Sequence, residues 1–322
     1  MSGLDFSRYA LTSCVAAAML VGCGGSQMPV AFDAGTKDAT TTVSVENPTY
    51  EVSDDLLYIT NFDPGTPYDD VKIYHAKAKN PSPFAVITSG ISYPTGDCID
   101  GNGTLYVSNE PPSGPGWVSE YPLGKLKASI VITKGINTPG FCAIDGLGDL
   151  WVTNIDGPSV TEYKQGSKKP LRTITNGLTY PVGIAIDHSG NLYVSNRPSQ
   201  YYGNVVVYGP GKKFPSRTIT DGVTSPAGIA VDAEGSLYVS NLFENNVEKY
   251  LAGQSDPYES ITDGVNDAVD VTANKKGRLF VTNYGNNIVV EFPPNSTTPS
   301  GPQISKGLYT PASSAYYPAL IP

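Results

Sequence analysis

The chain has 322 residues, of which 34 are Gly and 27 are Pro, and this share of turn-forming residues argues against a helical protein. Its 21 tyrosines favour β-strands. The formal net charge is −9 and the sequence has no basic stripe, which argues against a nucleic-acid partner and disfavours a phosphate-rich ligand.

Residues 1–23 have the features of an export signal. Arg8 precedes an apolar run, Leu11–Val21, which is too short to remain as a membrane-spanning helix. The run ends in Leu20–Cys23, which resembles a bacterial lipobox, where the Cys is lipidated and becomes the first mature residue. We therefore expect an exported protein anchored in the cell envelope through Cys23, in the outer membrane if the cell is Gram-negative. An ordinary cleaved signal is the alternative.

Residues 24–50 are small and polar without an apolar period, which predicts a flexible tether. In residues 51–322, one string of apolar, aromatic and β-branched residues then recurs at steps of 42 to 48 residues. Side chains of different kinds alternate along the string, which predicts a half-buried strand. The six copies are Leu57–Asn61, Leu105–Asn109, Leu150–Asn154, Leu192–Asn196, Leu237–Asn241 and Leu279–Asn283.

Each copy belongs to a longer unit. An apolar strand and an Asp-x-x-Gly turn come before the string, as in Asp232–Gly235. A Val-x-x-Tyr strand follows it, as in Val247–Tyr250, and a last strand ends in Ile-Thr-x-Gly, as in Ile219–Gly222. Four strands per unit of this length are typical of propeller blades. We predict an all-β fold, a six-bladed β-propeller of four-stranded antiparallel blades, in a monomeric protein.

The end of the chain predicts how the ring closes. Lys306–Pro311 matches the start of another unit, but no second string follows it. Residues 312–317 are therefore expected to supply the innermost strand of blade one, which closes the ring without an open sheet edge. The alternative is that Tyr50–Ser53 takes that place.

The unit at residues 226–241 reads Pro-x-Gly-Ile-Ala-Val-Asp-x-x-Gly-x-Leu-Tyr-Val-Ser-Asn and resembles an NHL repeat. The resemblance covers the chain from about residue 51 onward, although Asn ends the second strand where the family usually has Asp. It implies the propeller fold. It does not imply one function, because NHL-type propellers include protein-binding modules, RNA-binding modules and a lyase with a zinc site.

Chain direction places the loops that enter the first strand and leave the second strand of each blade on one face, here called the top face. The Asn residues that end the second strands belong to these loops, and they are either a polar collar for a ligand or caps for their own loops. They are Asn61, Asn109, Asn154, Asn196, Asn241 and Asn283.

Three residues of the innermost strands break the repeat. Asp270 and Phe141 stand where other blades have a small residue such as Gly228, and Asp97 stands where other blades have an apolar residue. Two carboxylates near the top of the central channel predict a site for a cation or a polar ligand. The alternative is that channel water solvates them.

Aromatic residues gather in the top loops, and Trp117, Tyr201 and Tyr202 are the candidates to contact a ligand. Such residues on a rigid scaffold suit sugar rings or peptides, unless they only pack their own Pro-rich loops. Further aromatics on this face are Phe62, Tyr68, Phe243 and Tyr284.

Catalytic motifs are scarce. The only histidines, His75 and His188, fall in different parts of different blades, and no nucleophile elbow or phosphate loop is present. The favoured function is a non-catalytic binding propeller without a cofactor, whose partner is a glycan, a peptide or a protein. The alternative is a lactonase or lyase that holds a divalent cation in its channel with Asp97, Asp270 and collar Asn side chains, although its metal ligands are unknown.

Cys98 and Cys142 are expected on the innermost strands of blades two and three. In an exported protein such a pair predicts a disulfide. The two positions have opposite parity along their strands, so the thiols either face each other across the blade interface or point apart. Two buried free thiols are the alternative.

Overall fold

The computed structural model describes residues 49–52, 55–62, 69–199, 201–301 and 303–319. The expected signal with Cys23, almost all of the tether, and Tyr68 lie outside these residues. Within them, no helix has the length and apolar character that a membrane crossing requires.

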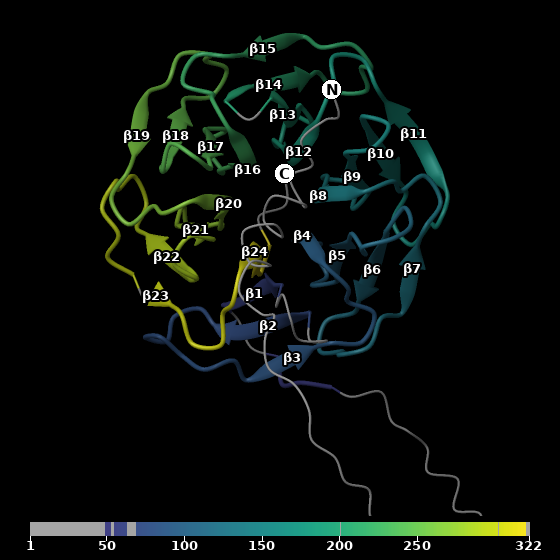
Figure 1. Ribbon diagram of the computed structural model, residues 1–322, viewed down its shortest axis with the longest axis vertical. Coiled ribbons are helices and arrows are strands. Elements are labelled where there is room, and N and C mark those ends of the chain that lie inside the picture. Colours follow the sequence, from purple (N-terminus) through teal and green to yellow (C-terminus); the bar gives the residue numbers. More distant parts are fainter. Residues whose placement is uncertain (1–48, 53–54, 63–68, 200, 302, 320–322) are drawn as a thin grey trace, which may run out of the picture. The chain divides into compact units, whose positions relative to one another are not determined.

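Six four-stranded antiparallel sheets form a ring, with the innermost strands facing its centre (Figure 1), which confirms the predicted six-bladed propeller. From the centre outwards, blade 1 has β24 (Pro311–Tyr317), β1 (Leu56–Asn61), β2 (Asp70–His75) and β3 (Ala85–Ile87), blade 2 has β4 (Pro94–Ile99), β5 (Leu105–Asn109), β6 (Trp117–Tyr121) and β7 (Ile130–Ile132), and blade 3 has β8 (Pro139–Ile144), β9 (Leu150–Asn154), β10 (Ser159–Tyr163) and β11 (Pro170–Ile174). Blade 4 has β12 (Pro181–Ile186), β13 (Leu192–Ser199), β14 (Tyr202–Tyr208) and β15 (Arg217–Ile219), blade 5 has β16 (Pro226–Val231), β17 (Leu237–Asn241), β18 (Asn246–Tyr250) and β19 (Glu259–Ile261), and blade 6 has β20 (Ala268–Ala273), β21 (Leu279–Asn283), β22 (Ile288–Phe292) and β23 (Gln303–Ile304).

The two outer repeat motifs meet between neighbouring blades. In five blades, the buried Tyr that ends the Val-x-x-Tyr motif donates a hydrogen bond of 2.6 to 2.8 Å to a backbone carbonyl of the preceding blade. The acceptor is the third residue of that blade's Ile-Thr-x-Gly motif, which reads Ile-Ser-x-Gly in blade 6. The donors and acceptors are Tyr74 and Lys306, Tyr121 and Ser89, Tyr163 and Lys134, Tyr208 and Asn176, and Tyr250 and Asp221. Blade 6 has the buried Phe292 at this position. Each Tyr thus fills the apolar interface with its ring and satisfies a loop carbonyl with its hydroxyl.

The C-terminal strand closes the ring, as predicted. β24 pairs antiparallel with β1 from Leu56, opposite Tyr317, to Asn61, opposite Pro311. The alternative segment lies elsewhere, because the amide of Tyr50 donates to the carbonyl of Gly124 at 3.0 Å, in the turn between β6 and β7. The interpretation that Tyr50–Ser53 fills the innermost place of blade 1 is therefore wrong.

Candidate functional site

The six innermost strands surround a central cavity of about 140 Å³. All six innermost strands contribute residues to its wall, among them Ile144, Ile184 and Val231, whose side chains belong to the apolar clusters between the blades. Asp97 and Asp270 line its upper end, and Phe141 lies at the same level. The structure therefore brings together, around one cavity, the three residues that break the repeat.

One serine of the closing strand connects the two carboxyl groups. Ser313 Oγ donates a short hydrogen bond to Asp97 Oδ1 and lies 3.2 Å from Asp270 Oδ2. The amide of Ser314 donates to the same Asp270 oxygen at 2.9 Å. A hydroxyl has a single proton, so a Ser313 that donates to Asp97 can only accept from Asp270. The contact with Asp270 then requires a proton on that carboxyl group.

The electrostatics of the pair agree with this proton count. Asp97 and Asp270 are 5% and 4% exposed. Burial raises the pKa of Asp270 to about 7, against hydrogen bonds that lower it. Burial also raises the pKa of Asp97 well above its ordinary value, and the nearby Asp270 raises it further. The pair therefore retains at least one proton at neutral pH.

A glycine makes room for the Asp270 carboxyl group. Gly228, at the matching position of the neighbouring strand β16, lies so close that an added Cβ would stand 2.2 Å from Asp270 Oδ1. The small residue on one strand and the carboxyl group on the next are therefore complementary.

Cys98 and Cys142 lie beside this site on β4 and β8. Their sulfur atoms are joined as a disulfide and their Cα atoms are 5.6 Å apart, within the range that a disulfide requires. Of the two orientations left open by strand parity, the thiols thus adopt the facing one.

We expect no free thiol from Cys98 and Cys142 when the unfolded protein is titrated without reductant. Reduction should lower the free energy of unfolding by about 4 kcal/mol, because the bridge closes a loop with a sequence separation of 44 in the unfolded chain. Comparing melting temperatures with and without reductant measures the effect. Two titratable thiols from these positions would rule the bridge out.

The six Asn residues do not form a ligand collar. They are at most 2% exposed, and each side-chain oxygen accepts a backbone N–H from the loop that enters the innermost strand of its own blade. The pairs are Asn61 with Tyr309, Asn109 with Ser92, Asn154 with Asn137, Asn196 with Thr179, Asn241 with Thr224 and Asn283 with Asn266. Capping of their own loops, the alternative interpretation, describes them correctly.

The candidate aromatic residues differ in how far their side chains are exposed to a ligand. The Trp117 ring nitrogen contacts the carbonyl of Gly90 at 3.2 Å and Ser119 Oγ at 3.1 Å, so this half-buried side chain is held between the loop that enters β4 and its own strand, β6. Phe62 packs against Tyr93 with ring centroids 4.7 Å apart. By contrast, Tyr201 and Tyr202 are 60% and 76% exposed.

Blade 4 carries these two tyrosines at the end of an extended strand pair. β13 and β14 continue beyond the Asn196–Asn204 pair, and Ser199 pairs with Tyr202 at the tip. The Tyr201 ring lies 6.2 Å from that of Phe243, which is 41% exposed on the neighbouring blade 5. We call Tyr201, Tyr202 and Phe243 the top patch. It is an exposed aromatic surface held by a β-hairpin that the other blades lack among the described residues.

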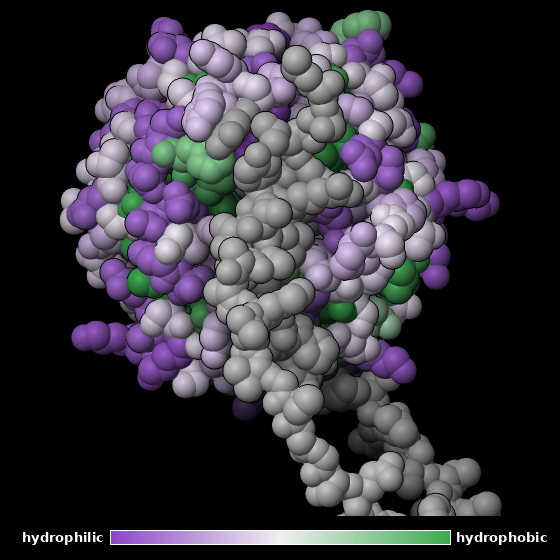
Figure 2. All heavy atoms as spheres, in the orientation of Figure 1, coloured by the Kyte–Doolittle hydropathy of each residue, from purple (hydrophilic) through white to green (hydrophobic). Residues whose placement is uncertain are grey.

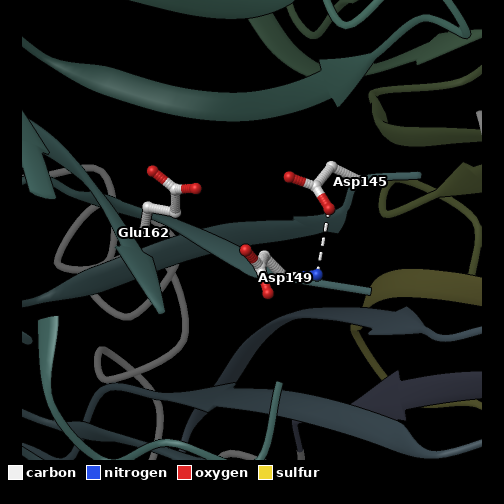
Figure 3. A group of neighbouring side chains, drawn as sticks. All are labelled: Asp145, Asp149 and Glu162. Carbon is white, nitrogen blue, oxygen red and sulfur yellow. Dashed lines mark hydrogen bonds between the residues drawn. The ribbon is translucent and has the colours of Figure 1, made fainter. Parts of the chain in front are cut away.

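Sequence reasoning missed an acidic cluster in blade 3. Asp145, Asp149 and Glu162 lie close together (Figure 3), with carboxylate oxygens within 4.8 Å of one another. Asp145 accepts the amide of Asp149 at 2.9 Å and the ring nitrogen of Trp151 at 3.0 Å. Arg172 forms an ion pair with Glu162. Internal pairing therefore explains the cluster. Of its three residues, Asp145 could be predicted from the turn motif at residues 145–148, and Asp149 and Glu162 lie outside that motif.

The histidines are placed as expected. His75 ends β2 of blade 1 and stacks on Phe84 at 4.3 Å, whereas His188 follows β12 of blade 4. They belong to blades on opposite sides of the ring (Figure 1) and do not share a metal site.

No protein-family model matches this chain, and no curated protein matches it. Among solved structures it is similar to a chain in the crystal structure of a nidogen/laminin complex, with 16% identity, a TM-score of 0.66, and coverage of 81% of this chain and 97% of the other. It is also similar to a protein of unknown function from Bacteroides caccae, with 10% identity, a TM-score of 0.63, and coverage of 82% and 99%. At these identities the likeness shows the propeller fold alone.

Proposed function

We propose that this protein is a non-catalytic binding propeller, exported and tethered at the bacterial cell envelope, and that its top patch binds a glycan or an extended peptide. The observation that carries the proposal is the hairpin of blade 4, which holds Tyr201 and Tyr202 out of the ring. Exposed tyrosines offer both ring faces and hydroxyl groups to a ligand.

The exposure of the patch favours a ligand that is bound by stacking. Its three aromatic rings lie on two adjacent blades and are 41% to 76% exposed. On the face visible in Figure 2, hydrophilic and weakly polar residues predominate and apolar residues form small groups. The hairpin is already ordered by strand pairing, so little conformational entropy is lost when a ligand docks.

The top-patch proposal predicts the outcome of a glycan and peptide array probed with residues 24–322. A double substitution of Tyr201 and Tyr202 by Ser should lower affinity for any hit at least tenfold and leave the melting temperature within about 2 °C, because exposed side chains contribute little to stability. The matched control is Tyr258→Ser, since Tyr258 is 63% exposed in the loop before β19 on the opposite face. Equal losses from both variants, or no hit on the array, would contradict the proposal.

Anchoring through Cys23 is a separate part of the proposal. The full-length protein should partition into membranes or detergent, and Cys23→Ala should release or misprocess it, because lipidation needs the thiol. Fractionation and mass spectrometry of the mature N-terminus measure both effects. A fully soluble native protein with an unmodified N-terminus would show that the lipobox interpretation is wrong.

The cation-dependent enzyme is less well supported. Its expected ligands included the collar Asn side chains, which are buried in their loops. Calcium takes six to eight oxygen ligands, whereas the carboxyl groups among the described residues that line the cavity are limited to those of Asp97 and Asp270.

A further inference from the structure

Lysine side chains gather on the face opposite the top face. This face consists of the turns from the first to the second strand and from the third to the fourth strand of each blade, and the two turns lie side by side, as Gly148 and Gln165 do in blade 3. Its lysines come in small groups from separate blades, so the sequence shows no long basic run. We call this surface the basic face. Its exposed basic residues are Lys77, Lys79, Lys125, Lys127, Lys164, Lys168, Lys169, Lys212, Lys213, Lys275, Lys276 and Arg278.

The acidic side chains of the same turns are less exposed. Asp100, Asp187 and Asp232 are buried, and each accepts two backbone amides of its own turn. Even when such buried acids are counted, basic side chains outnumber acidic ones among the described residues of these turns. The exposed acids among them are limited to Glu51, Glu234 and Asp256.

The top loops have the opposite balance of charge. Their exposed basic residues, among those that the structure describes, are limited to Lys134 and Lys306. Their exposed acids are Asp156, Asp221, Glu244 and Asp263. An anionic surface therefore attracts the basic face and repels the top face.

Large apolar side chains accompany the lysines. Leu147, in the Asp-x-x-Gly turn of blade 3, is 81% exposed, and Phe214, directly after Lys212 and Lys213 in blade 4, is 71% exposed. Leu147 and Lys212 line one groove between these blades. Membrane interfaces bind such surfaces, because apolar groups enter the boundary of the acyl chains while lysines contact anionic headgroups. A soluble polyanion would use the lysines alone.

The chain also enters the propeller on this face. Thr49 forms a β-bridge with Lys125, and the amide of Tyr50 donates to the carbonyl of Gly124 at 3.0 Å, in the turn from the third to the fourth strand of blade 2. Cys23, the expected lipid attachment site, precedes this point in the sequence. An anchored propeller can therefore lay its basic face on the membrane without passing the chain around the ring.

We propose that the basic face docks on an anionic lipid membrane, with its lysines on the headgroups and with Leu147 and Phe214 in the boundary of the acyl chains. The inference rests on the proposed anchor at Cys23, to which docking adds a second, reversible contact. In this orientation the top patch faces away from the membrane, where Tyr201 and Tyr202 are accessible to a ligand.

Co-sedimentation of residues 24–322, produced without lipid, with vesicles tests docking separately from anchoring. Residues 48–322 form one compact unit, so this chain keeps the whole ring. We expect it to bind phosphatidylcholine vesicles that contain about 30% phosphatidylglycerol, and not phosphatidylcholine alone. Raising the salt from about 0.1 M to about 0.5 M should weaken binding at least tenfold, because salt screens exposed charges. The formal charge of −9 opposes binding, so binding requires an oriented basic face.

Two double variants with the same change in net charge distinguish the faces. Lys168→Glu with Lys169→Glu, on the basic face, should weaken vesicle binding at least tenfold, because each basic residue near an anionic membrane strengthens binding about fivefold. Lys134→Glu with Lys306→Glu, on the top face, should change it by less than about twofold. All four side chains are exposed, so both variants should keep the native melting temperature.

A third variant, Leu147→Ser with Phe214→Ser, should also weaken vesicle binding, because it removes the apolar contact. Docking on a membrane would be overturned by a lack of vesicle binding, by equal losses from the two lysine variants, or by full binding of the Leu147 and Phe214 variant. Polygalacturonate, a soluble polyanion, that binds as tightly as the anionic vesicles would also overturn it. None of these outcomes bears on Cys23, whose lipidation is measured by fractionation of the full-length protein.

Discussion

A chain that lacks residues 307–322 should lose its soluble monomer. The deletion removes β24, which pairs along the whole of β1 and carries the buried Ala315 and Tyr316. It also removes Ser313, whose hydroxyl group contacts Asp97 of blade 2 and Asp270 of blade 6. The β1 edge and the apolar faces beside it become exposed, and such edges promote aggregation.

Size-exclusion chromatography and thermal melting of the truncated chain measure this effect. We expect aggregated protein or a chain without a cooperative transition. A chain that ends at residue 319 keeps all of β24 and serves as the control. A 1–306 chain that melts like the full-length protein would show that β24 is dispensable for closing the ring.

Asp270→Asn should stabilise the protein at pH 8 and change little at pH 4. The folded pKa of Asp270, about 7, lies above its ordinary value of 3.8 because of burial. The folded state therefore binds the proton more tightly than the unfolded state does. The protonated group stabilises the fold fully below about pH 4, and this stabilisation is lost as pH rises through about 7. At pH 8 the native protein buries a charge that the Asn variant lacks.

The gain at pH 8 has an upper limit of about 4 kcal/mol, because the shift from 3.8 to about 7 is roughly three units at about 1.4 kcal/mol each. Asn cannot reproduce both contacts of Asp270 Oδ2, because an amide oxygen there accepts the Ser314 amide but has no proton to donate to Ser313 Oγ, so the gain stays below this limit. Denaturant melts at pH 4 and pH 8 measure the difference, with the exposed Asp256→Asn as control. A variant that is less stable than the native protein at pH 8 would contradict the buried acid pair.

The fold could be predicted because each motif is repeated and each repeat has a local cause. The turn at Asp232 shows this: its side chain accepts the amides of Glu234 and Ser236, and Gly235 takes a φ of +82°. Ring closure followed from Lys306–Pro311, which repeats the start of a unit, and the strand after this repeat, β24, pairs with β1.

The site was less predictable, because its contacts join strands that are distant in sequence. Alignment placed Asp97 and Asp270 near the top of the channel, but their connection through Ser313 depends on how β24 packs between β4 and β20. The interpretation of Asn109 as a ligand residue failed because an Asn at a strand end has the same sequence pattern whether it faces water or caps a loop.

The hairpin of blade 4 shows a third limit. The segment after Asn196 contains Pro198, which normally indicates a loop and not a strand. In the structure β13 nevertheless extends to Ser199, at the exposed tip where a missing backbone N–H is tolerated. The length of the segment could identify a long loop but not the strand pairing within it.

Hydrogen–deuterium exchange with the best ligand from the array tests the central claim, binding at the top patch, most directly. We predict that the ligand slows exchange in residues 196–204 and 241–246, which carry Tyr201, Tyr202 and Phe243, and leaves the opposite-face turn at 232–235 unchanged. Protection confined to that turn or to the innermost strands would contradict the claim.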